Sequence, residues 1–527
     1  MTKVKKEAVS RGPVPCNGKN QLVIALDFGT TYSGVAYCFA NQRNTEVVAI
    51  TNWPGAEGEA TPKVPTLINY DVNGDFVWGA SVDRTLHNNI VGVKLLLDPS
   101  QEQPVYLPSV NMKRTLRVLP KPAVEIAADF LGAIYGHAMT EIAKVVPSEY
   151  MSLCEKQFVL SVPAVWSDTA KNATLEAAEM AGIFPVTLIK EPEAAALYTM
   201  RSLDFSLREG DAFLVCDAGG GTVDLISYEV AAIRPDLHLK ELVPGTGGIG
   251  GSLLLNKLFA ETFKDLIGEE KEIKIRSTVK RAFRGDPKEE YFVSFPMTSL
   301  EDAPKLGIEG SCWKMTGEDC MEIFSPVINR VLGLIDNQLK SAIMKRGGKK
   351  ITMRATKTID SFPANRNCHP QGIFLVGGFG SSQYLKARVE VCHPGIQVLQ
   401  PADAWAAIVK GAAMSGLPSG SKIIATCSTK HYGVQACRPY ELADHPGLPI
   451  IISEYTGFKM VSAMTWYINI GDDIQRDQKI RFPFYRSIDG DYSSTDLIFT
   501  DCLIECSDPY VSASFPACSQ ARQGELD

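Results

Sequence analysis

The sequence predicts an α/β fold of two similar lobes that face each other across a cleft, followed by a small β-rich module. The main observation is a repeated motif, in which an apolar strand ends on an aspartate, a turn rich in Gly and Thr follows, and an alternating strand leads away. One copy spans residues 22–39 and the other spans residues 213–228. Two such units at this separation indicate a duplicated half-domain. After about residue 420, short alternating segments replace the mixture of helices and strands.

The length of 527 residues is sufficient for about three domains. We expect a disordered tail over residues 1–20, which are basic and interrupted by Gly and Pro. Lobe I is expected over residues 21–200. Lobe II is expected over residues 201–420, with a return to lobe I near its C-terminal end. The β-rich module is expected over residues 421–527.

Helices and strands alternate along the first 420 residues. Apolar spacing near 3.6 predicts the helices, and continuous apolar runs predict buried strands. The expected helices span 123–145, 168–181, 252–263, 316–343 and 405–414, and the expected strands span 158–163, 185–189, 239–243 and 372–376. Ser167 is suited to cap the second of these helices, and Gly182 is suited to end it. Prolines punctuate residues 52–119, which we expect to form a loop-rich subdomain.

In the C-terminal module, the even positions of residues 464–470 are apolar, which predicts a half-buried strand. Ile480, Phe482 and Phe484 continue the alternation. Pro483 indicates that this second strand lies at the edge of a sheet, because proline cannot donate a ladder hydrogen bond.

The two repeated turns predict a nucleotide in the cleft, because glycines let backbone N–H groups approach phosphate oxygens and threonine hydroxyls add further donors. Asp27 and Asp217 end the two strands. A carboxylate at about 4 Å from a phosphate charge costs roughly 4 kcal/mol at an effective dielectric near 20. Mg²⁺ removes this repulsion, since it bridges phosphates and keeps several waters. We therefore predict that both aspartates bind the hydration shell of Mg²⁺, although either alone could simply close a hairpin turn.

Three further segments contain candidate site residues. Lys94 lies in an apolar run and is either a surface lysine or a cation directed at the γ-phosphate. Glu191 follows a strand, where α/β sheets place ligands, although a helix N-terminus also favours an acidic residue. Residues 245–250 match G-x-G-x-x-G, a dinucleotide-binding pattern. We interpret them as a loop forming one wall of the same nucleotide site, because the repeated turns already account for phosphate binding.

The composition gives no indication of other partners. A net charge of −7 provides no reason to expect binding to nucleic acid or to an anionic membrane. No apolar run reaches the length that spans a membrane, and the basic N-terminus lacks the apolar core of a secretory signal. Thirteen cysteines without framework spacing, with Cys38 and Cys216 inside apolar strands, predict a reducing compartment. We expect a cytoplasmic protein, with the nucleus also open.

Several motifs together resemble those of a known family. Residues 27–33, 217–224 and 376–380 resemble the two phosphate motifs and the adenosine motif of the actin-like ATPase superfamily. Residues 162–164 and 190–196 resemble the heat-shock protein 70 family within it. Lys94 and the phrase His431-Tyr432-Gly433-Val434 are similar to the divergent branch that is common in fungi and is present in animals as the "12" subfamily.

This resemblance implies the two-lobed actin-like ATPase fold, with duplicated ribonuclease H-like cores and with ATP or ADP and Mg²⁺ at the base of the cleft. The implied catalytic residues are Lys94, Glu191, Asp217 and Thr222, with Lys94 stabilising charge on the γ-phosphate and Glu191 positioning metal-bound water. Metal contacts through water are implied for Asp27 and Asp217. The implied nucleotide contacts are Gly29, Thr30, Thr31, Tyr32, Gly219, Gly220, Gly221, Thr222, Gly250, Gly251, Lys280, Arg281, Gly377, Gly378 and Asp403.

The resemblance implies a chaperone-like protein that binds ATP and slowly hydrolyses it to ADP and phosphate. Closure of its lobes would switch the binding of protein clients or co-chaperones, and Pro163 with Lys171 matches the pair thought to relay the nucleotide state. A second hypothesis is a nucleotide-gated scaffold or binding protein with negligible hydrolysis. It is motivated by Phe379 and Ser381, which replace small hydroxyl and basic residues of the adenosine motif.

The same hypothesis is motivated by the lack of an apolar-acidic linker in residues 419–427. Ser252 and Leu253 are a further departure, since they replace acidic residues of the family. A small-molecule kinase on the same fold is disfavoured, because no carboxylate base beside an acceptor pocket is evident.

Overall fold

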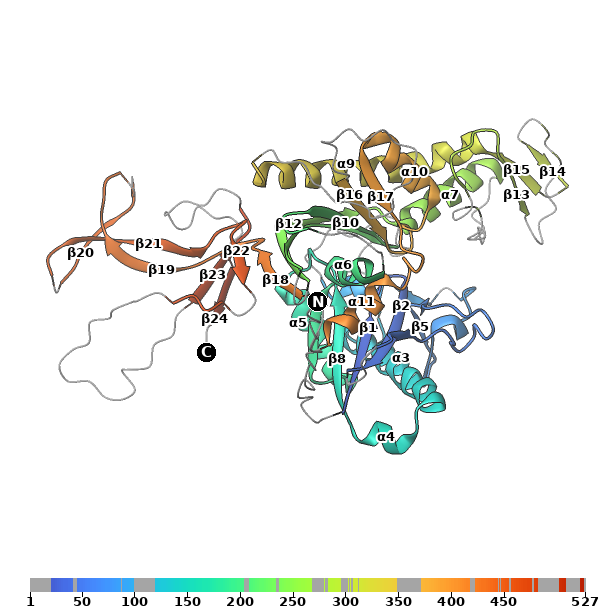
Figure 1. Cartoon of the computed structure of the whole chain (residues 1–527), viewed down its shortest axis with the longest axis horizontal. Coiled ribbons are helices and arrows are strands. Elements are labelled where there is room, and N and C mark those ends of the chain that lie inside the picture. Colours follow the sequence, from blue (N-terminus) through green and yellow to red (C-terminus); the bar gives the residue numbers. More distant parts are fainter. Residues whose placement is uncertain are drawn as a thin grey trace, which may run out of the picture.

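The structure is a computed structural model of the chain, and it describes residues 20–40, 45–86, 88–98, 119–202, 208–233, 237–267, 279, 283–294, 302, 304, 307–310, 312–347, 371–417, 422–443, 445, 447–454, 456–475, 478–481, 502–508 and 522–525. The expected disordered tail lies outside the described residues up to residue 19, and Asn20 already begins the first strand. Figure 1 shows two bodies stacked on each other, with the strands from β19 onward extending to one side.

The first sheet has the strand order β3-β2-β1-β8-β9. Strands β1 and β2 form an antiparallel hairpin in which Asp27 lies opposite Gly34, while β8 and β9 continue the sheet in parallel. A short strand, β4, pairs with the beginning of β2. The bounds are β1 Asn20–Asp27, β2 Tyr32–Phe39, β3 Val48–Ala49, β4 Val64–Pro65, β8 Cys154–Val162 and β9 Val186–Lys190.

The second sheet repeats this order with β12-β11-β10-β16-β17 and adds β18 and β22 beyond β12. Strands β10 and β11 again form an antiparallel hairpin, here with Asp217 opposite Asp224, and β16 lies parallel to β10. The predicted duplication is therefore confirmed at the level of sheet topology. The bounds are β10 Ala212–Ala218, β11 Thr222–Ala232, β12 His238–Ile249, β16 Gln371–Val376, β17 Ile396–Leu399, β18 Lys422–Cys427 and β22 Asp473–Gln475.

Both sheets are buried on both faces, which explains why their central strands are almost entirely apolar. In β1, alternate residues pack into different cores: Leu22, Ile24 and Leu26 face α3 and α5, whereas Val23 and Ala25 face the space between the sheets. That central core also contains residues of β10, α6 and α11. Helices α7, α9 and α10 contribute to the core on the outer face of the second sheet. The result is a layered α/β arrangement in which α6 and α11 lie between the two sheets.

The helix predictions agree closely with the structure. Helix α3 has the predicted limits, and Ser167 caps α5 by accepting a hydrogen bond from the Ala170 N–H at 3.2 Å. Thr316 caps α9 and forms a capping box with Asp319. The helices are α1 Val93–Leu96, α3 Ala123–Val145, α4 Ser148–Ser152, α5 Asp168–Met180, α6 Glu191–Ser202, α7 Ser252–Ile267, α9 Gly317–Lys345, α10 Gln383–Cys392 and α11 Ala407–Ser415. Within the described residues, no helix is both long and apolar enough to cross a bilayer.

One expectation needs correction, and another gains detail. Residues 245–249 form the end of β12 rather than a loop, because they pair with β11 in a register that places Gly248 opposite Val223. In the expected loop-rich subdomain, the described part contains a small sheet of β6, β5 and β7, whose strands have only two to four residues. Their bounds are β5 Leu67–Tyr70, β6 Phe76–Trp78 and β7 Ile90–Val91, with a 3₁₀ turn, η1, at Gly79–Ser81.

The remaining strands form two smaller sheets. One is β13-β15-β14, and the other is the C-terminal sheet β20-β21-β19-β23-β24. In β21, Val461, Ala463 and Met464 are buried, so the predicted alternation of even positions is only partly realised. Residues 482–484, predicted as part of an edge strand, lie outside the described residues. The bounds are β13 Glu290–Ser294, β14 Ile308–Glu309, β15 Cys312–Thr316, β19 His431–Pro439, β20 Ile450–Ile452, β21 Lys459–Ile468, β23 Cys502–Cys506 and β24 Arg522–Glu525.

Candidate nucleotide site

The two repeated turns line one cavity of about 450 Å³ between the lobes. Each turn connects the strands of its hairpin, and the cavity lies where β1, β10 and β16 end. The predicted site residues that line this cavity are Asp27, Gly29, Thr30, Thr31, Tyr32, Lys94, Glu191, Asp217, Gly219, Gly220, Gly221, Thr222, Gly377 and Gly378. Most of the predicted site therefore comes together in a single place.

The two turns approach each other so closely that a side chain at Gly220 would clash with the first turn. A Cβ atom added to Gly220 would lie 2.2 Å from Thr31 Oγ1. One added to Gly221 would lie 3.0 Å from Thr30 Cγ2. The threonines of one lobe thus occupy the space that side chains of the other lobe would need. Backbone N–H groups and hydroxyls from both lobes are gathered around the same small volume, an arrangement suited to binding phosphate.

Each turn is held by hydrogen bonds from its surroundings. In the first turn, Gly29 N–H donates to Ser33 Oγ at 3.2 Å. In the second, Gly219 N–H donates to Thr222 O at 2.9 Å, and Ser252 N–H at the start of α7 donates to Gly219 O at 3.1 Å. Hydrogen bonds within the protein therefore stabilise both turns.

Gly250 and Gly251 lie behind the second turn. Gly250 N–H donates to Gly221 O at 3.2 Å, and a Cβ atom on Gly251 would lie 2.4 Å from Gly220 O. They contact the phosphate turn and do not line the cavity. The neighbouring Ser252 does line it.

Lys94 and Glu191 form a buried ion pair in the cavity. Lys94 lies in the short helix α1 and is 2% exposed, so it is not a surface lysine, and its Nζ contacts Glu191 Oε1. Its Nζ also lies 5.3 Å from the centre of the Trp166 ring. Glu191 begins α6 directly after β9, at the carboxyl end of a parallel strand. Burial raises the pKa of Glu191 even though Lys94 opposes this shift.

Asp27 is paired with a second lysine, Lys63, whose Nζ lies 2.5 Å from Asp27 Oδ2. Ser161 Oγ donates to the other oxygen of Asp27 at 2.8 Å. Burial alone would raise the pKa of Asp27, but the ammonium groups of Lys63 and Lys94 outweigh it and lower this pKa. Burial alone would lower the pKa of Lys63, but the negative charge of Asp27 has the larger effect and raises this pKa. Both groups are therefore charged.

On the other lobe, Asp217 and Asp224 form no ion pair with a lysine within the described residues, although Thr222 and the Ala164 backbone hydrogen-bond to Asp224. Asp217 Oδ1 and Asp224 Oδ1 are buried and accept no hydrogen bond from the described residues. Burial raises the pKa of Asp217 well above its ordinary value, and Glu191 and Asp224 add to this effect. Burial and the charge of Glu191 raise the pKa of Asp224 to about 7. An additional cation in the cavity would relieve this accumulation of negative charge.

These residues fit a magnesium ion held mainly through water. Four carboxylates and two lysines line or adjoin the cavity, which leaves a formal charge of −2 when all are ionised; they are Asp27, Glu191, Asp217, Asp224, Lys63 and Lys94. In the described part of the chain, no three His, Cys, Asp or Glu side chains form a metal-binding cluster on their own. Mg²⁺ characteristically uses one or two carboxylates, several waters and substrate phosphates instead of a complete protein cage.

The adenosine motif forms the wall beside Asp217. Gly377 has a positive φ of 85°, and a Cβ atom there would lie 2.2 Å from Asp217 Oδ1. Phe379 is 4% exposed and packs into the core of the second lobe, so its side chain stabilises the loop. Trp405 lines the same cavity and packs edge-on against Tyr32, with ring centres 5.4 Å apart.

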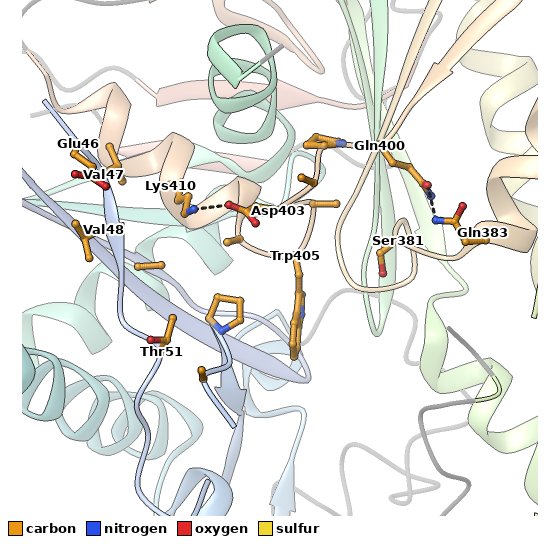
Figure 2. Close-up of a pocket in the computed structure, with 17 residues that line it drawn as sticks. Glu46, Val47, Val48, Thr51, Ser381, Gln383, Gln400, Asp403, Trp405 and Lys410 are labelled. Atoms are coloured by element: carbon orange, nitrogen blue, oxygen red, sulfur yellow. Dashed lines mark hydrogen bonds and ion pairs between the residues drawn. The ribbon is translucent and has the colours of Figure 1, made fainter. Parts of the chain in front are cut away.

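Asp403 lies in a neighbouring cavity of about 720 Å³ rather than in the cavity of the phosphate turns (Figure 2). Its carboxylate accepts hydrogen bonds from Lys410 Nζ at 2.6 Å and from the Tyr198 hydroxyl at 3.2 Å. The two cavities share Ser381 and Trp405 as lining residues. The predicted adenosine-binding residues Lys280 and Arg281 lie outside the described residues.

Sequence reasoning missed several residues of the site, four of which are polar or aromatic and bear on its chemistry. Lys63 and Trp405 lie on segments without a phosphate-binding pattern, and Asn256 lies within α7. Asp224 was visible as part of the second motif, and the hairpin register that places it opposite Asp217 could have identified it. The indication of Lys63 in the sequence was weaker than that of Asp224, namely a lysine between two prolines in an otherwise polar stretch.

Comparison with known proteins identifies a consistent set of relatives. Residues 23–232 match the family model described as Hsp70 protein. Heat shock 70 kDa protein 12A of Mus musculus is 25% identical over 541 aligned residues, covering 82% of this chain and 75% of that protein. Heat shock 70 kDa protein 12B of Homo sapiens is 24% identical over 578 residues, covering 88% and 79%. Chaperone protein DnaK of Mycoplasmoides gallisepticum is 29% identical over 218 residues, covering 41% and 32%.

Proposed function

The chain belongs to the heat-shock protein 70 family, in a divergent branch similar to the 12A and 12B proteins, and we propose that it is a slow Mg²⁺-dependent ATPase whose lobe closure switches the binding of a protein client or partner. As an Hsp70-type protein with the actin-like ATPase fold, it binds ATP. The observation that carries the proposal is the contact between the two phosphate turns, with Lys94, Glu191 and Asp217 around the same cavity.

In this proposal the protein acts mainly by positioning the nucleotide. Backbone N–H groups and hydroxyls of Thr30, Thr31 and Thr222 donate to the β- and γ-phosphates, and the second turn donates from the opposite lobe. Bound Mg²⁺ would be held by Asp27 and Asp217 through water and would neutralise charge on the phosphates. Phosphoryl transfer to water requires little covalent chemistry from the protein, so correct placement and charge stabilisation supply most of the rate.

Lys94 and Glu191 act together on the γ-phosphate. The ammonium group of Lys94 stabilises negative charge that moves onto the transferred oxygens. Glu191 holds Lys94 in place through their ion pair and accepts a hydrogen bond from the attacking water. Because both side chains are buried, their charges are screened less than they would be at the surface.

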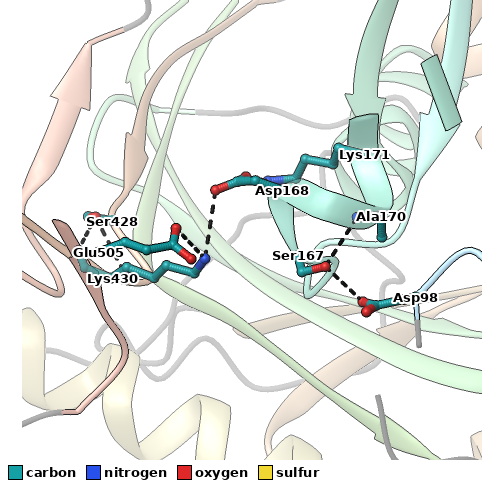
Figure 3. A network of polar contacts seen from close by, with 8 residues as sticks. All are labelled: Asp98, Ser167, Asp168, Ala170, Lys171, Ser428, Lys430 and Glu505. Carbon is teal, nitrogen blue, oxygen red and sulfur yellow. Dashed lines mark hydrogen bonds and ion pairs between the residues drawn. The ribbon is translucent and has the colours of Figure 1, made fainter. Parts of the chain in front are cut away.

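A polar network supports communication with the C-terminal sheet (Figure 3). Asp98, just after α1 and Lys94, accepts a hydrogen bond from Ser167 Oγ at 3.1 Å. Ser167 caps α5, whose first residue, Asp168, lies 3.7 Å from Lys430 Nζ. Lys430 also pairs with Glu505 at 2.7 Å. A movement of Lys94 on nucleotide binding would therefore reach the C-terminal sheet through short contacts.

The second candidate function, a nucleotide-gated scaffold with negligible hydrolysis, is favoured by the adenosine side of the site. Phe379 packs into the core and presents an apolar side chain to the cavity, and Asp403 is bound by Lys410 and Tyr198 in the neighbouring cavity. Fewer polar groups are therefore available to contact the adenosine than the resemblance to the family implies. Nucleotide affinity and turnover would then be lower than the phosphate turns alone suggest.

Steady-state hydrolysis and calorimetry distinguish the two functions. We expect the parent protein to hydrolyse ATP only with Mg²⁺, and Thr222→Ala and Lys94→Ala to reduce the rate by about 10² to 10³, which is typical when one group stabilising a transition state is lost. ATP binding with hydrolysis no faster than that of Lys94→Ala would favour the scaffold. If the parent bound no nucleotide at all, both functions would be wrong. Circular dichroism confirms that each variant is folded.

A further inference from the structure

Lys63 is a second buried lysine at the phosphate turns, and the family motifs do not include it. It lies immediately before β4, is 7% exposed, and lines the cavity together with Lys94. Its Nζ is 2.5 Å from Asp27 Oδ2, so it contacts one of the two aspartates expected to organise Mg²⁺. Its counterpart on the other lobe, Asp217, forms no such ion pair within the described residues, and its Oδ1 accepts no hydrogen bond from them.

The position of Lys63 is fixed by its backbone. Strand β4 pairs with β2, with Val64 opposite Ser33. Thr66 N–H donates to Thr31 O at 2.8 Å, and Thr66 Oγ1 donates to Gly29 O at 2.8 Å. The segment that carries Lys63 is therefore bonded directly to the first phosphate turn.

Gly34, in strand β2 just after the first phosphate turn, leaves room for the side chain of Lys63. A Cβ atom on Gly34 would lie 2.8 Å from Pro62 O and 3.2 Å from Lys63 Cγ. The glycine after the first motif thus allows the stem of Lys63 to pass close to β2 and reach Asp27. A lysine that merely covered the surface would not need such a path, because its ammonium group would extend into water.

We propose that Lys63 is a fixed cation of the nucleotide site, which neutralises Asp27 and contacts the polyphosphate, so that nucleotide binding is only weakly dependent on Mg²⁺. This inference rests on the proposed nucleotide-binding function and deepens it. Asp27 and the phosphates are both negative, and the ammonium group has three donors, so it can bind both at once. Mg²⁺ would then be needed on the side of Asp217 and Asp224, whose Oδ1 atoms accept no hydrogen bond within the described residues and which no lysine there neutralises.

The test is the affinity for ATP and ADP, measured by calorimetry with Mg²⁺ and with EDTA. We expect EDTA to weaken binding by the parent by less than roughly tenfold, and to weaken binding by Lys63→Met by roughly 100-fold or more. Lys63→Arg keeps the charge and should resemble the parent. Lys121→Met is the matched control, because it also removes a lysine from an ion pair, with Asp129, but lies outside both cavities.

Lys63→Met leaves Asp27 buried without its cation, so the variant can fail to fold. In that event the double variant Asp27→Asn with Lys63→Met, which removes both charges, is measured in place of Lys63→Met. EDTA is expected to weaken its binding of ATP and ADP by the same factor as expected for Lys63→Met. If neither variant folds, the ratio of the Kd of the parent in EDTA to its Kd with Mg²⁺ decides. A parent whose affinity falls by more than roughly tenfold in EDTA, or variants whose affinity falls by the same factor as that of the parent, would overturn the role of Lys63 while leaving nucleotide binding intact. Absence of binding in every condition would overturn both.

Discussion

Replacing Gly220 with alanine tests the contact between the two phosphate turns. The added Cβ atom would lie 2.2 Å from Thr31 Oγ1, 2.6 Å from its Cγ2 and 2.9 Å from its Cβ. Ordinary contact begins near 3.4 Å, so the turns would have to separate by up to about 1.2 Å, the difference between 3.4 and the 2.2 Å to Oγ1, and by about 0.5 Å if only the contact with the Thr31 Cβ atom at 2.9 Å remained. Rotation of the Thr31 side chain is insufficient, because its Cβ atom is fixed to the backbone and is also too close.

The separation should weaken nucleotide binding much more than folding. A misplacement of about 1 Å can cost about 100-fold where chemistry depends on positioning. We therefore expect the Kd for ATP to rise by about 10- to 100-fold, equivalent to about 1.4–2.7 kcal/mol. Calorimetry measures this directly. Gly136→Ala is the matched control, because Gly136 lies inside α3 with no atom within 4 Å of a Cβ added there.

A double-mutant cycle with Thr31→Ala makes the test specific. Thr31→Ala removes Oγ1 and Cγ2, the two atoms nearest to the added Cβ. If the turns are in contact, Gly220→Ala should cost less in the Thr31→Ala background than in the parent. Unchanged ATP affinity in Gly220→Ala, or the same loss in both backgrounds, would refute the arrangement of the site described above.

Two further predictions concern the contact with the C-terminal sheet and the buried thiols. Lys430→Glu should repel both Asp168 and Glu505, and should speed amide hydrogen exchange in β19 and at the start of α5. The free energy of unfolding should change by only about 1 kcal/mol, because these pairs are partly exposed. Exchange at the start of α5 that is equal in parent and variant would contradict the contact with Asp168. Burial raises the pKa of the Cys38 thiol to about 12, so at pH 8 very little reactive thiolate is present. Iodoacetamide should therefore alkylate the exposed Cys392 and Cys437 in the native protein well before Cys38, as mass spectrometry can establish, and early labelling of Cys38 would contradict its burial.

Local patterns predicted most of the secondary structure that positions the site. Helix α3 begins and ends at the predicted residues, and Ser167 caps α5 as expected, since apolar periodicity and capping depend on residues a few positions apart. The extension of β12 through residues 245–249 was missed. Its glycines resemble a loop in sequence, and only pairing with β11 makes them a strand.

By itself, the sequence determined that two Asp-Gly-Thr turns exist and that each suits phosphate, because a turn's conformation and its donors are local properties. The tertiary structure decided that Gly220 lies against Thr31, that Lys63 pairs with Asp27, and that Asp403 lies in a separate cavity. These relations join segments far apart in the chain. Their geometry follows from how the sheets and the central helices α6 and α11 pack, and no short pattern encodes that packing.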